Sequence, residues 1–219
     1  MSDRIILHCD LNNFFASCSL LFNPTLKDMP VAVCGDSENR HGIVLAKNEI
    51  AKQFGIKTAE PIFQAQRKCK DLVILPPLYD AYEEYSKKAQ EIYSRYTDII
   101  EPFGIDECWL DVTGSTLLFG SGEQIANSIR ETIKKELGLT VSVGVSFNKV
   151  FAKLGSDMKK PDGTTVISRE NFKEKVWSLP VSDLLFVGKS TTDKLKSIGI
   201  NLIGDVSICD DATLTRLLG

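Results

Sequence analysis

Long apolar segments and histidines are scarce in this sequence. None of its apolar runs is long enough to cross a bilayer, and no membrane partner is expected. The apolar stretch near the N-terminus is short, runs into an acid and lacks a small-residue cleavage site, which argues against a secretory signal. The two histidines, His8 and His41, lie far apart in the sequence, so a zinc site is not expected.

Paired cysteines are missing as well. None of the six cysteines belongs to a Cys-x-x-Cys motif. Most have apolar neighbours, and we interpret them as small core residues of a protein in a reducing, cytoplasmic compartment. The cysteines are Cys9, Cys18, Cys34, Cys69, Cys108 and Cys209.

The chain also lacks a surplus of positive charge. Its formal net charge is −3 and its isoelectric point is about 5.5, which argues weakly against nucleic acid as a partner. Binding to phosphates needs local lysines and arginines, so their distribution decides the matter rather than the total. What is present is ordinary for a globular protein: 43% apolar and 25% charged residues in a chain of 219. That length has room for one domain and one or two small appendages.

Hydrophobic periodicity predicts a mixed α/β pattern. If an insert at roughly 13–79 is set aside, the order is strand, helix, two strands, helix, strand, which predicts a split βαβ, ferredoxin-like α+β fold. The insert contains a hairpin of two strands and several short helices. The expected strands are 5–9, 31–34, 43–46, 72–75, 99–103, 108–112 and 141–145, the last of them half-buried, and the two long helices carry apolar stripes at 82–96 and 125–137.

Capping residues and breakers set further boundaries. Asn12 or Asn13 is expected to cap a helix that runs to about Leu21. Beyond position 168 the chain changes to short helices. The stretch 184–200 predicts a helix, a glycine-containing turn and a second helix, with Ser190 as its cap and Gly199 as its end.

Three acids form the candidate catalytic group. Asp10 closes the first apolar strand, and Asp106-Glu107 lies between two later strands. In a split βαβ sheet the first strand and the strand after the central helix are neighbours, so the three carboxylates can converge. Hard oxygen ligands without His or Cys favour magnesium, and such a site suits two-metal phosphoryl transfer. Taken alone, however, Asp10 is better explained as a helix cap or a solvated loop acid, and an Asp-Glu pair is common by chance.

Three longer segments carry a resemblance to a known family. They are 10–17 (DLNNFFAS), 104–111 (GIDECWLD) and 144–163 (GVSFNKVFAKLGSDMKKPDG). In order and spacing they resemble the three signature blocks of the Y-family DNA polymerases, of the UmuC and DinB kind, over essentially the whole chain. The resemblance implies an error-prone translesion polymerase that adds deoxynucleotides to a DNA 3′ end and acts in DNA damage repair.

The resemblance also implies an organisation and a set of roles. The palm comprises 1–13 and 80–167, the fingers 14–79 and the start of the thumb 168–219, while the family's little-finger domain is absent from this chain. Asp10, Asp106 and Glu107 are expected to be catalytic and, with the Leu11 carbonyl, to hold two Mg²⁺ ions, for which Mn²⁺ can substitute. The expected partners are primer-template DNA and deoxynucleoside triphosphates, and a sliding clamp is a candidate.

The resemblance implies nucleotide contacts, and the distribution of lysines indicates contacts with DNA. The amides of Phe14 and Phe15 at a helix start suit triphosphate oxygens, and the Phe15 ring is the expected steric gate against a ribose 2′-hydroxyl. Lys160 matches the family's triphosphate lysine. Lys149 and Lys153 belong to a lysine-rich stretch that suits phosphate contact, although a solvated face is the alternative explanation.

The sequence departs from the family pattern at two places. A Tyr-x-x-Arg pair that grips the triphosphate in much of the family is replaced here by Glu49 and Lys52, so Lys52 offers charge without a bidentate fork. The thumb's hairpin usually has two glycines and contacts duplex phosphates through backbone amides. Here Phe186 takes one glycine place and Gly188 remains.

Two other functions compete with a polymerase. A non-catalytic DNA-binding accessory relative would keep the shape without the chemistry, and the intact acids argue against it. A nucleotidyl cyclase also places paired acids on a ferredoxin-like sheet, but the Phe14-Phe15 block and the thumb pieces disfavour it.

Overall fold

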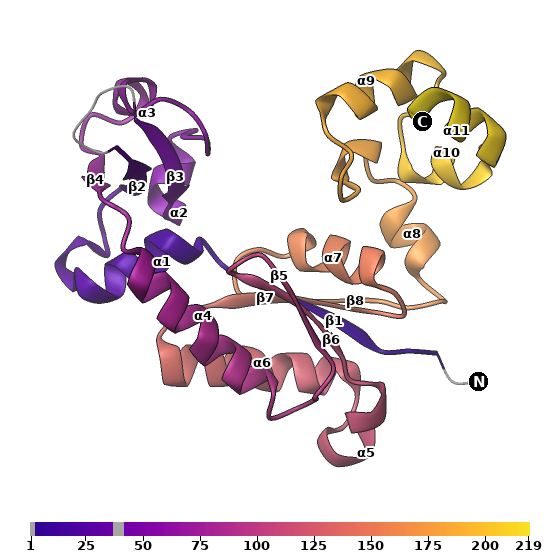
Figure 1. Cartoon of the computed structure of the whole chain (residues 1–219), viewed down its shortest axis with the longest axis horizontal. Coiled ribbons are helices and arrows are strands. Elements are labelled where there is room, and N and C mark those ends of the chain that lie inside the picture. Colours follow the sequence, from indigo (N-terminus) through magenta and orange to yellow (C-terminus); the bar gives the residue numbers. More distant parts are fainter. Residues whose placement is uncertain (1–2, 37–41) are drawn as a thin grey trace.

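The computed structural model describes residues 3–36 and 42–219 and is built around a five-stranded sheet (Figure 1). The strand order is β5-β6-β1-β7-β8. β1 runs antiparallel to both of its neighbours, β6 and β7, and β8 lies parallel to β7 at the edge. The strands are β1 (Ile6–Leu11), β5 (Ile100–Phe103), β6 (Glu107–Asp111), β7 (Val141–Ser146) and β8 (Thr164–Ile167).

This sheet confirms the predicted ferredoxin-like α+β pattern, with two refinements. β6, the second strand after the long helix, is the one that pairs with β1, because β5 lies beyond it at the edge. β8 was not predicted from the sequence. It extends the four-stranded pattern by one parallel strand after α7 (Lys149–Met158).

Helices cover both faces of the sheet. α4 (Tyr79–Tyr93) and α6 (Gly122–Leu137) lie together on one face, and α7 lies on the other (Figure 1). The predicted stripes of α4 and α6 are confirmed as core: Tyr82, Ile92, Ile129 and Ile133 are buried in one cluster with β1 and β7.

β7 is buried along its whole length, so the prediction of a half-buried strand is wrong. The small residues that suggested a solvent face lie under α7 instead. At Gly144 a Cβ atom would be 1.9 Å from the Ala152 carbonyl oxygen, so only glycine allows the helix to pack this close.

The insert forms a second body with its own sheet, in the order β3-β2-β4. β2 and β3 are antiparallel, which confirms the predicted hairpin, and β4 is parallel to β2. Residues 37–41 of the predicted polar connection lie outside the described residues. The elements are α1 (Phe14–Phe22), the 3₁₀ turn η1 (Pro24–Leu26), β2 (Val31–Gly35), β3 (Ile43–Lys47), α2 (Glu49–Gln53), α3 (Ile62–Lys68) and β4 (Val73–Leu75).

Capping of the first helix differs from the prediction. Asn13 precedes α1 in a left-handed conformation (φ 49°), and its side chain makes no capping bond. Asn48 does cap α2, because its side chain accepts a hydrogen bond from the Ala51 amide. The Asn13 side chain is used elsewhere, as described below.

The C-terminal part is helical, as expected, but its boundaries shift. Only the 3₁₀ turn η3 (Val181–Asp183) precedes the glycine-containing turn, and Gly188 rather than Ser190 occupies the N-cap of the following helix. Ser190 lies inside its first turn, whereas Gly199 ends it with φ 86° as predicted. The helices are α8 (Phe172–Val176), α9 (Lys189–Ser197), α10 (Ile203–Ile208) and α11 (Asp211–Leu218); η2 (Thr113–Ser115) and α5 (Thr116–Phe119) lie between β6 and α6.

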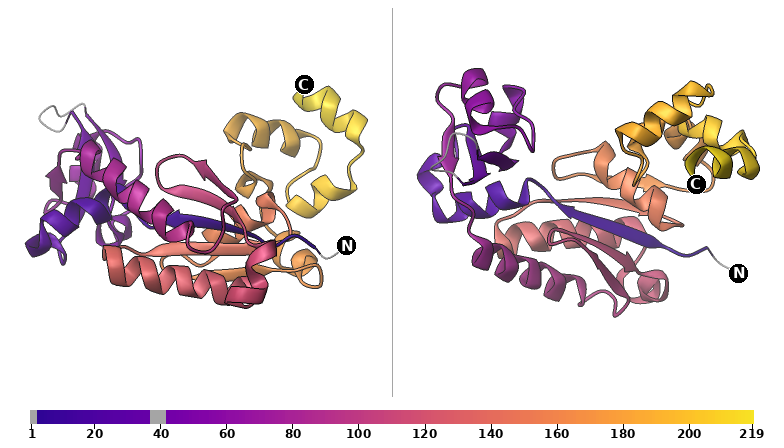
Figure 2. Two further views of the ribbon diagram at one scale, coloured as in Figure 1. Left: turned by 60° about the horizontal axis from the view of Figure 1, so that its bottom comes forward. Right: turned by 45° about the horizontal axis from the view of Figure 1, so that its top comes forward.

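The insert and the C-terminal helices form two outer bodies. Both lie on the side of the main sheet that carries α7, at opposite ends of that sheet (Figures 1 and 2). All six cysteines are free and five of them are buried, which confirms their interpretation as core residues. Among the described residues, no helix combines the length and apolarity that a membrane span needs.

Candidate active site

The three acids converge where β1 meets β6. Asp10 and Glu107 are direct partners in the antiparallel register. Asp106 lies in the tight turn before β6, and its carbonyl oxygen accepts a hydrogen bond of 3.0 Å from the Leu11 amide. The predicted convergence is therefore confirmed: rigid strand backbone holds Asp10 and Glu107, and a backbone bond fixes the turn that carries Asp106.

A cavity of about 380 Å³ opens at these acids. Its wall comes from the main sheet, α1, β3, α7 and the residues after α7. The cavity therefore lies where the insert meets the main sheet. The lining residues include Asp10, Leu11, Asn13, Phe14, Phe15, Lys47, Thr58, Asp106, Glu107, Lys153 and Lys160.

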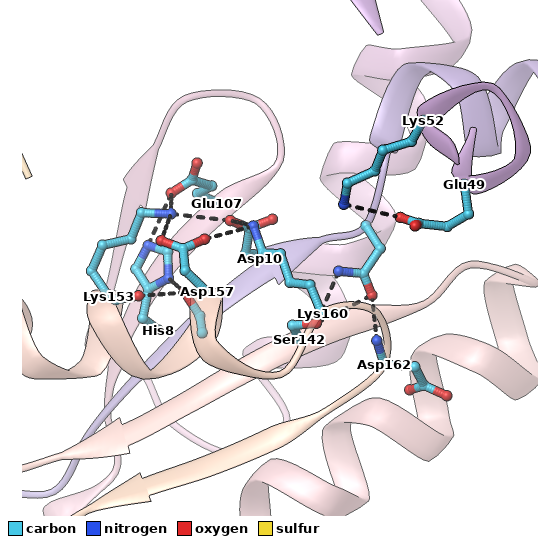
Figure 3. Close-up of polar contacts among 12 residues, drawn as sticks. His8, Asp10, Glu49, Lys52, Glu107, Ser142, Lys153, Asp157, Lys160 and Asp162 are labelled. Carbon is cyan, nitrogen blue, oxygen red and sulfur yellow. Dashed lines mark hydrogen bonds and ion pairs between the residues drawn. The ribbon is translucent and has the colours of Figure 1, made fainter. Parts of the chain in front are cut away.

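Two lysines pair with Asp10 and Glu107 (Figure 3). The Nζ atom of Lys160 lies 2.6 Å from Asp10 Oδ2 and 2.8 Å from Asp157 Oδ1. The Nζ atom of Lys153 lies 3.1 Å from Asp10 Oδ2, 3.0 Å from Glu107 Oε2 and 3.3 Å from Asp157 Oδ2. Asp157, on the exposed side of α7, thus shares both ammonium groups with the acids of the sheet.

This placement changes the view of Lys153. The sequence suggested a contact with DNA, but its side chain is only 13% exposed and points into the acid cluster. Sequence reasoning missed Asp157, although its spacing of four residues from Lys153 and three from Lys160 indicates pairing on one helix face.

The electrostatics of Asp106 and Glu107 differ. Burial, followed by the charges of Asp10 and Glu107, raises the pKa of Asp106 from 3.8 to about 6. Burial also acts to raise the pKa of Glu107, but contacts with His8 and Lys153 outweigh it and lower that pKa to about 2. Of these two carboxyl groups, Asp106 is therefore the one at which a negative charge is less favoured.

The donor set fits a hard divalent cation. The acids offer carboxylate oxygens only, and the raised pKa of Asp106 marks a place where a cation relieves repulsion. Across residues 3–36 and 42–219, however, no three His, Cys, Asp or Glu side chains are grouped as a ready set of metal ligands. Lys153 and Lys160 take the role of counter-ions in this arrangement.

Asn12 ties the loop after α7 to the sheet. Its buried side chain accepts a hydrogen bond of 2.8 Å from the Asp162 amide and donates one of 2.9 Å to Ser142 Oγ. Asp162 in turn accepts from Arg130 of α6 at 2.9 Å. Because Lys160 precedes this anchored point by two residues, Asn12 helps to fix its backbone beside Asp10. The sequence offered Asn12 only as a helix cap.

The predicted gate residue is held by a second ring. The Phe15 ring stacks on Tyr82 at 4.1 Å with an angle of 9°, and the Tyr82 hydroxyl lies 2.8 Å from Ser19 Oγ. Phe15 and its neighbour Phe14 both line the cavity, and Phe14 is in addition buried in the main core. Tyr82, a core residue of α4, thus also orients the Phe15 ring at the cavity wall.

The fingers lysine predicted at the nucleotide is engaged elsewhere. Lys52 Nζ pairs with Glu49 at 3.6 Å, and Glu49 also accepts a hydrogen bond of 2.9 Å from Asn13 Nδ2. Lys47 lines the cavity, and its Nζ atom donates to Thr58 Oγ1 at 3.0 Å. In the described part of the chain no carboxylate lies within ion-pair distance of Lys47.

The remaining predicted DNA contacts lie outside this cavity. Lys149 pairs with Glu101 and lies over the Trp109 ring. Gly188 is exposed at the start of α9, where an added Cβ would meet nothing within 4 Å. Phe186 is 83% exposed with φ 68°, a conformation that glycine adopts without strain.

Comparison with known proteins places this geometry in a family. The model of the impB/mucB/samB family matches residues 9–157, and the model described as the IMS family HHH motif matches residues 169–200. The DNA polymerase IV of Acetivibrio thermocellus is 59% identical over 216 residues, which cover 99% of this chain and 54% of that protein. DNA polymerase IV 1 of Bacillus subtilis is 41% identical and is covered to 52%. The chain thus spans about half the length of these two relatives.

Solved structures of Y-family DNA polymerases are also similar to this chain. An insertion ternary complex of Dbh DNA polymerase has a TM-score of 0.91 at 28% identity, covering 98% of this chain and 63% of that one. DinB from Sulfolobus solfataricus has a TM-score of 0.87 at 29% identity with the same coverage. The three acids, Phe15 and Lys153 lie within the residues that the first model matches, and the chain therefore belongs to the impB/mucB/samB family, with the fold of the Y-family DNA polymerase core.

Proposed function

We propose that this chain is the catalytic region of an error-prone, translesion DNA polymerase that adds deoxynucleotides to a DNA 3′ end. The observation that carries the proposal is the register pairing of Asp10 with Glu107, beside Asp106, at a cavity that Phe15 and Lys160 also line. The family's relatives named DNA polymerase IV support it. In this proposal 1–13 with 80–167 is the palm, 14–79 the fingers and 168–219 the thumb.

Asp10, Asp106 and Glu107 would hold divalent cations, two Mg²⁺ ions with Mn²⁺ as a substitute, and the Leu11 carbonyl would be a further ligand. When bound, such ions activate a 3′-hydroxyl and stabilise the triphosphate charge. The protein's own contribution is to hold the three carboxylates in place through strand and turn backbone and to pair Asp10 and Glu107 with lysines until substrate arrives.

Nucleotide binding would use residues of the main-sheet body and of the insert. Lys160 can leave Asp10 for triphosphate oxygens while Asp157 keeps it near the cavity. The amides of Phe14 and Phe15 at the start of α1 suit the same anion, and the Phe15 ring, fixed by Tyr82, would exclude a 2′-hydroxyl. Lys52, predicted for this role, is the fingers lysine that Glu49 already neutralises.

DNA would lie between the two outer bodies, over α7. Lys149 and the backbone at the exposed Gly188 are the proposed phosphate contacts. Lys153, which the sequence suggested as a third, pairs with Asp10 and Glu107 instead. Primer-template DNA is the proposed partner in the cytoplasm, and a sliding clamp is a further candidate.

Single-nucleotide insertion tests the proposal. Wild-type chain, Asp106→Asn and Phe15→Ala are incubated with primed DNA, magnesium and each deoxynucleotide in turn. Templated insertion that disappears in Asp106→Asn supports the polymerase. If the wild type inserts nothing, even when fused to a little-finger domain from a relative, the catalytic proposal fails and the non-catalytic accessory function replaces it. A cyclic nucleotide product would instead favour the cyclase.

A further inference from the structure

His8 is a fully buried polar residue in the middle of β1. Its relative exposure is 0%, and its register partners are Trp109 in β6 and Gly144 in β7. Burying an imidazole is unfavourable unless its nitrogens find partners. An apolar side chain could be buried at this position without that cost. The contacts of the imidazole ring therefore have to explain why a histidine is present.

Both ring nitrogens face polar groups on different elements (Figure 3). Nδ1 lies 2.9 Å from Ser156 Oγ on α7, and Nε2 lies 3.1 Å from Glu107 Oε2 on β6. The ring also meets Trp109 edge-on at 5.0 Å. Because a carboxylate only accepts hydrogen bonds, a proton on Nε2 is what suits the contact with Glu107.

The geometry follows from the period of two in a strand. His8 and Asp10 share the face of β1 that α7 covers, and Trp109 and Glu107 share the corresponding face of β6. His8 is therefore the diagonal neighbour of Glu107, within reach of its carboxylate. This spacing from Asp10 was visible in the sequence, but the diagonal contact needs the register.

We propose that His8 is a positioning residue that fixes the Glu107 carboxylate for binding of a divalent cation, an inference that rests on the proposed polymerase function. His8 and Lys153 both approach Oε2, which is buried, and this leaves Oε1 as the oxygen available to the cavity. Ser156 and Trp109 hold the ring from its other sides, so the direction of Nε2 is set by the fold rather than by rotation of the side chain.

The contact is close but not aligned as a hydrogen bond. Within the described residues, neither Nε2 nor Oε2 has a hydrogen-bond partner of good geometry, although they are 3.1 Å apart. Contacts of catalytic groups are often imperfectly aligned before substrate binds. Replacing a group behind a metal ligand commonly changes metal affinity 10–100-fold.

Two amide variants separate this role from a purely structural one. In His8→Gln the side-chain amide reaches the place of Nε2, towards Glu107. In His8→Asn it reaches only the place of Nδ1, towards Ser156. Both bury one amide, so circular dichroism and thermal unfolding are expected to show two folded proteins with similar losses of stability.

Two quantities are measured. One is direct Mn²⁺ binding, detected by electron paramagnetic resonance, and the other is the Mn²⁺ dependence of nucleotide insertion. We expect His8→Asn to weaken Mn²⁺ binding about tenfold and His8→Gln to stay within about threefold of the wild type. Equal Mn²⁺ affinities in the two variants would overturn the positioning role, as would an effect confined to DNA binding. The wild type and both variants could fail to insert nucleotides while Mn²⁺ affinity still differs between His8→Asn and His8→Gln. In that case the polymerase proposal fails and the role of His8 stands.

Discussion

Asp106 and Glu107 are neighbours in the chain, yet the fold displaces the pKa values of their carboxyl groups in opposite directions, to about 6 and about 2. Glu107 is the first residue of β6 and turns towards His8 and Lys153. Asp106 is in the turn before it and is half-buried beside two other acids, without an ion-pair partner among the described residues. The two members of the pair therefore differ in how they respond to pH and to cations.

The first prediction concerns the stability cost of Asp106. Its pKa in the folded chain lies above the ordinary 3.8, so the folded state binds its proton more tightly and loses stability as pH rises from 3.8 to about 6. The deficit is then fully present at pH 7. Without divalent ions, Asp106→Asn should be more stable than wild type by about 1–2 kcal/mol at pH 7 and no more stable at pH 3. Urea unfolding at the two pH values checks this, and an equal gain at both would contradict the electrostatic origin.

The second prediction concerns divalent cations. Millimolar Mg²⁺ or Mn²⁺ should raise the unfolding temperature of the wild type, because a ligand of the folded state stabilises it by mass action. The same ions should have little effect on Asp106→Asn, which lacks one carboxylate. Calcium-free buffer with matched ionic strength is the control. A rise of equal size in both proteins would point to ion binding outside the acid cluster.

The third prediction concerns sugar selection. Phe15→Ala removes the ring at the cavity wall, and discrimination between deoxy- and ribonucleotides should fall on the order of 100-fold in kcat/KM. Tyr82→Phe keeps the supporting ring and removes only the hydroxyl that meets Ser19. It should retain discrimination and lose about 1 kcal/mol of stability. Unchanged discrimination in Phe15→Ala would exclude this ring as the gate.

The fourth prediction compares two lysines of the fingers. Lys47 lines the cavity without an ion-pair partner among the described residues, and its pKa is lowered by burial and by the charge of Lys52. A phosphate would compensate this charge. Lys47→Ala should therefore raise KM for the incoming nucleotide about fivefold to tenfold, which corresponds to roughly 1–1.4 kcal/mol.

Lys52→Ala is the matched control, because Glu49 already neutralises that side chain. Its KM should stay within about twofold of the wild type, since the loss of an exposed pair has little effect. Steady-state kinetics with one nucleotide and one template measure both variants. The opposite ranking would restore Lys52 to the role that the sequence resemblance suggested.

The fifth prediction concerns Asn12. Asn12→Ala removes the side-chain hydrogen bonds to the Asp162 amide and to the buried Ser142 hydroxyl, and should cost about 1–3 kcal/mol of unfolding free energy. It should also raise KM for the nucleotide, because the loop that carries Lys160 loses its anchor. Asn23→Ala, which removes one bond to the Ser19 carbonyl away from the cavity, should leave KM unchanged. Equal kinetics in the two variants would separate Asn12 from nucleotide binding.

Much of the fold and the acids of the site were predictable from the sequence. The apolar run before Asp10, the stripes of α4 and α6 and the hairpin of β2 and β3 report which residues are buried, because local periodicity of two or 3.6 follows directly from strand and helix geometry. The failures also have local causes. β7 alternates with small residues that looked solvent-facing, and Ser190 has the chemistry of a cap without its position.

The sequence by itself thus determined the ferredoxin-like pattern, the three acids and the aromatic pair at the start of α1. Only the tertiary structure decided that His8 meets Glu107, that Asn12 holds Asp162 and that Lys47 rather than Lys52 lines the cavity. These contacts join residues up to 150 positions apart. They depend on strand register and on the packing of α7. A one-residue shift in either would replace every partner, and the hydrophobic pattern read from the sequence does not specify that register.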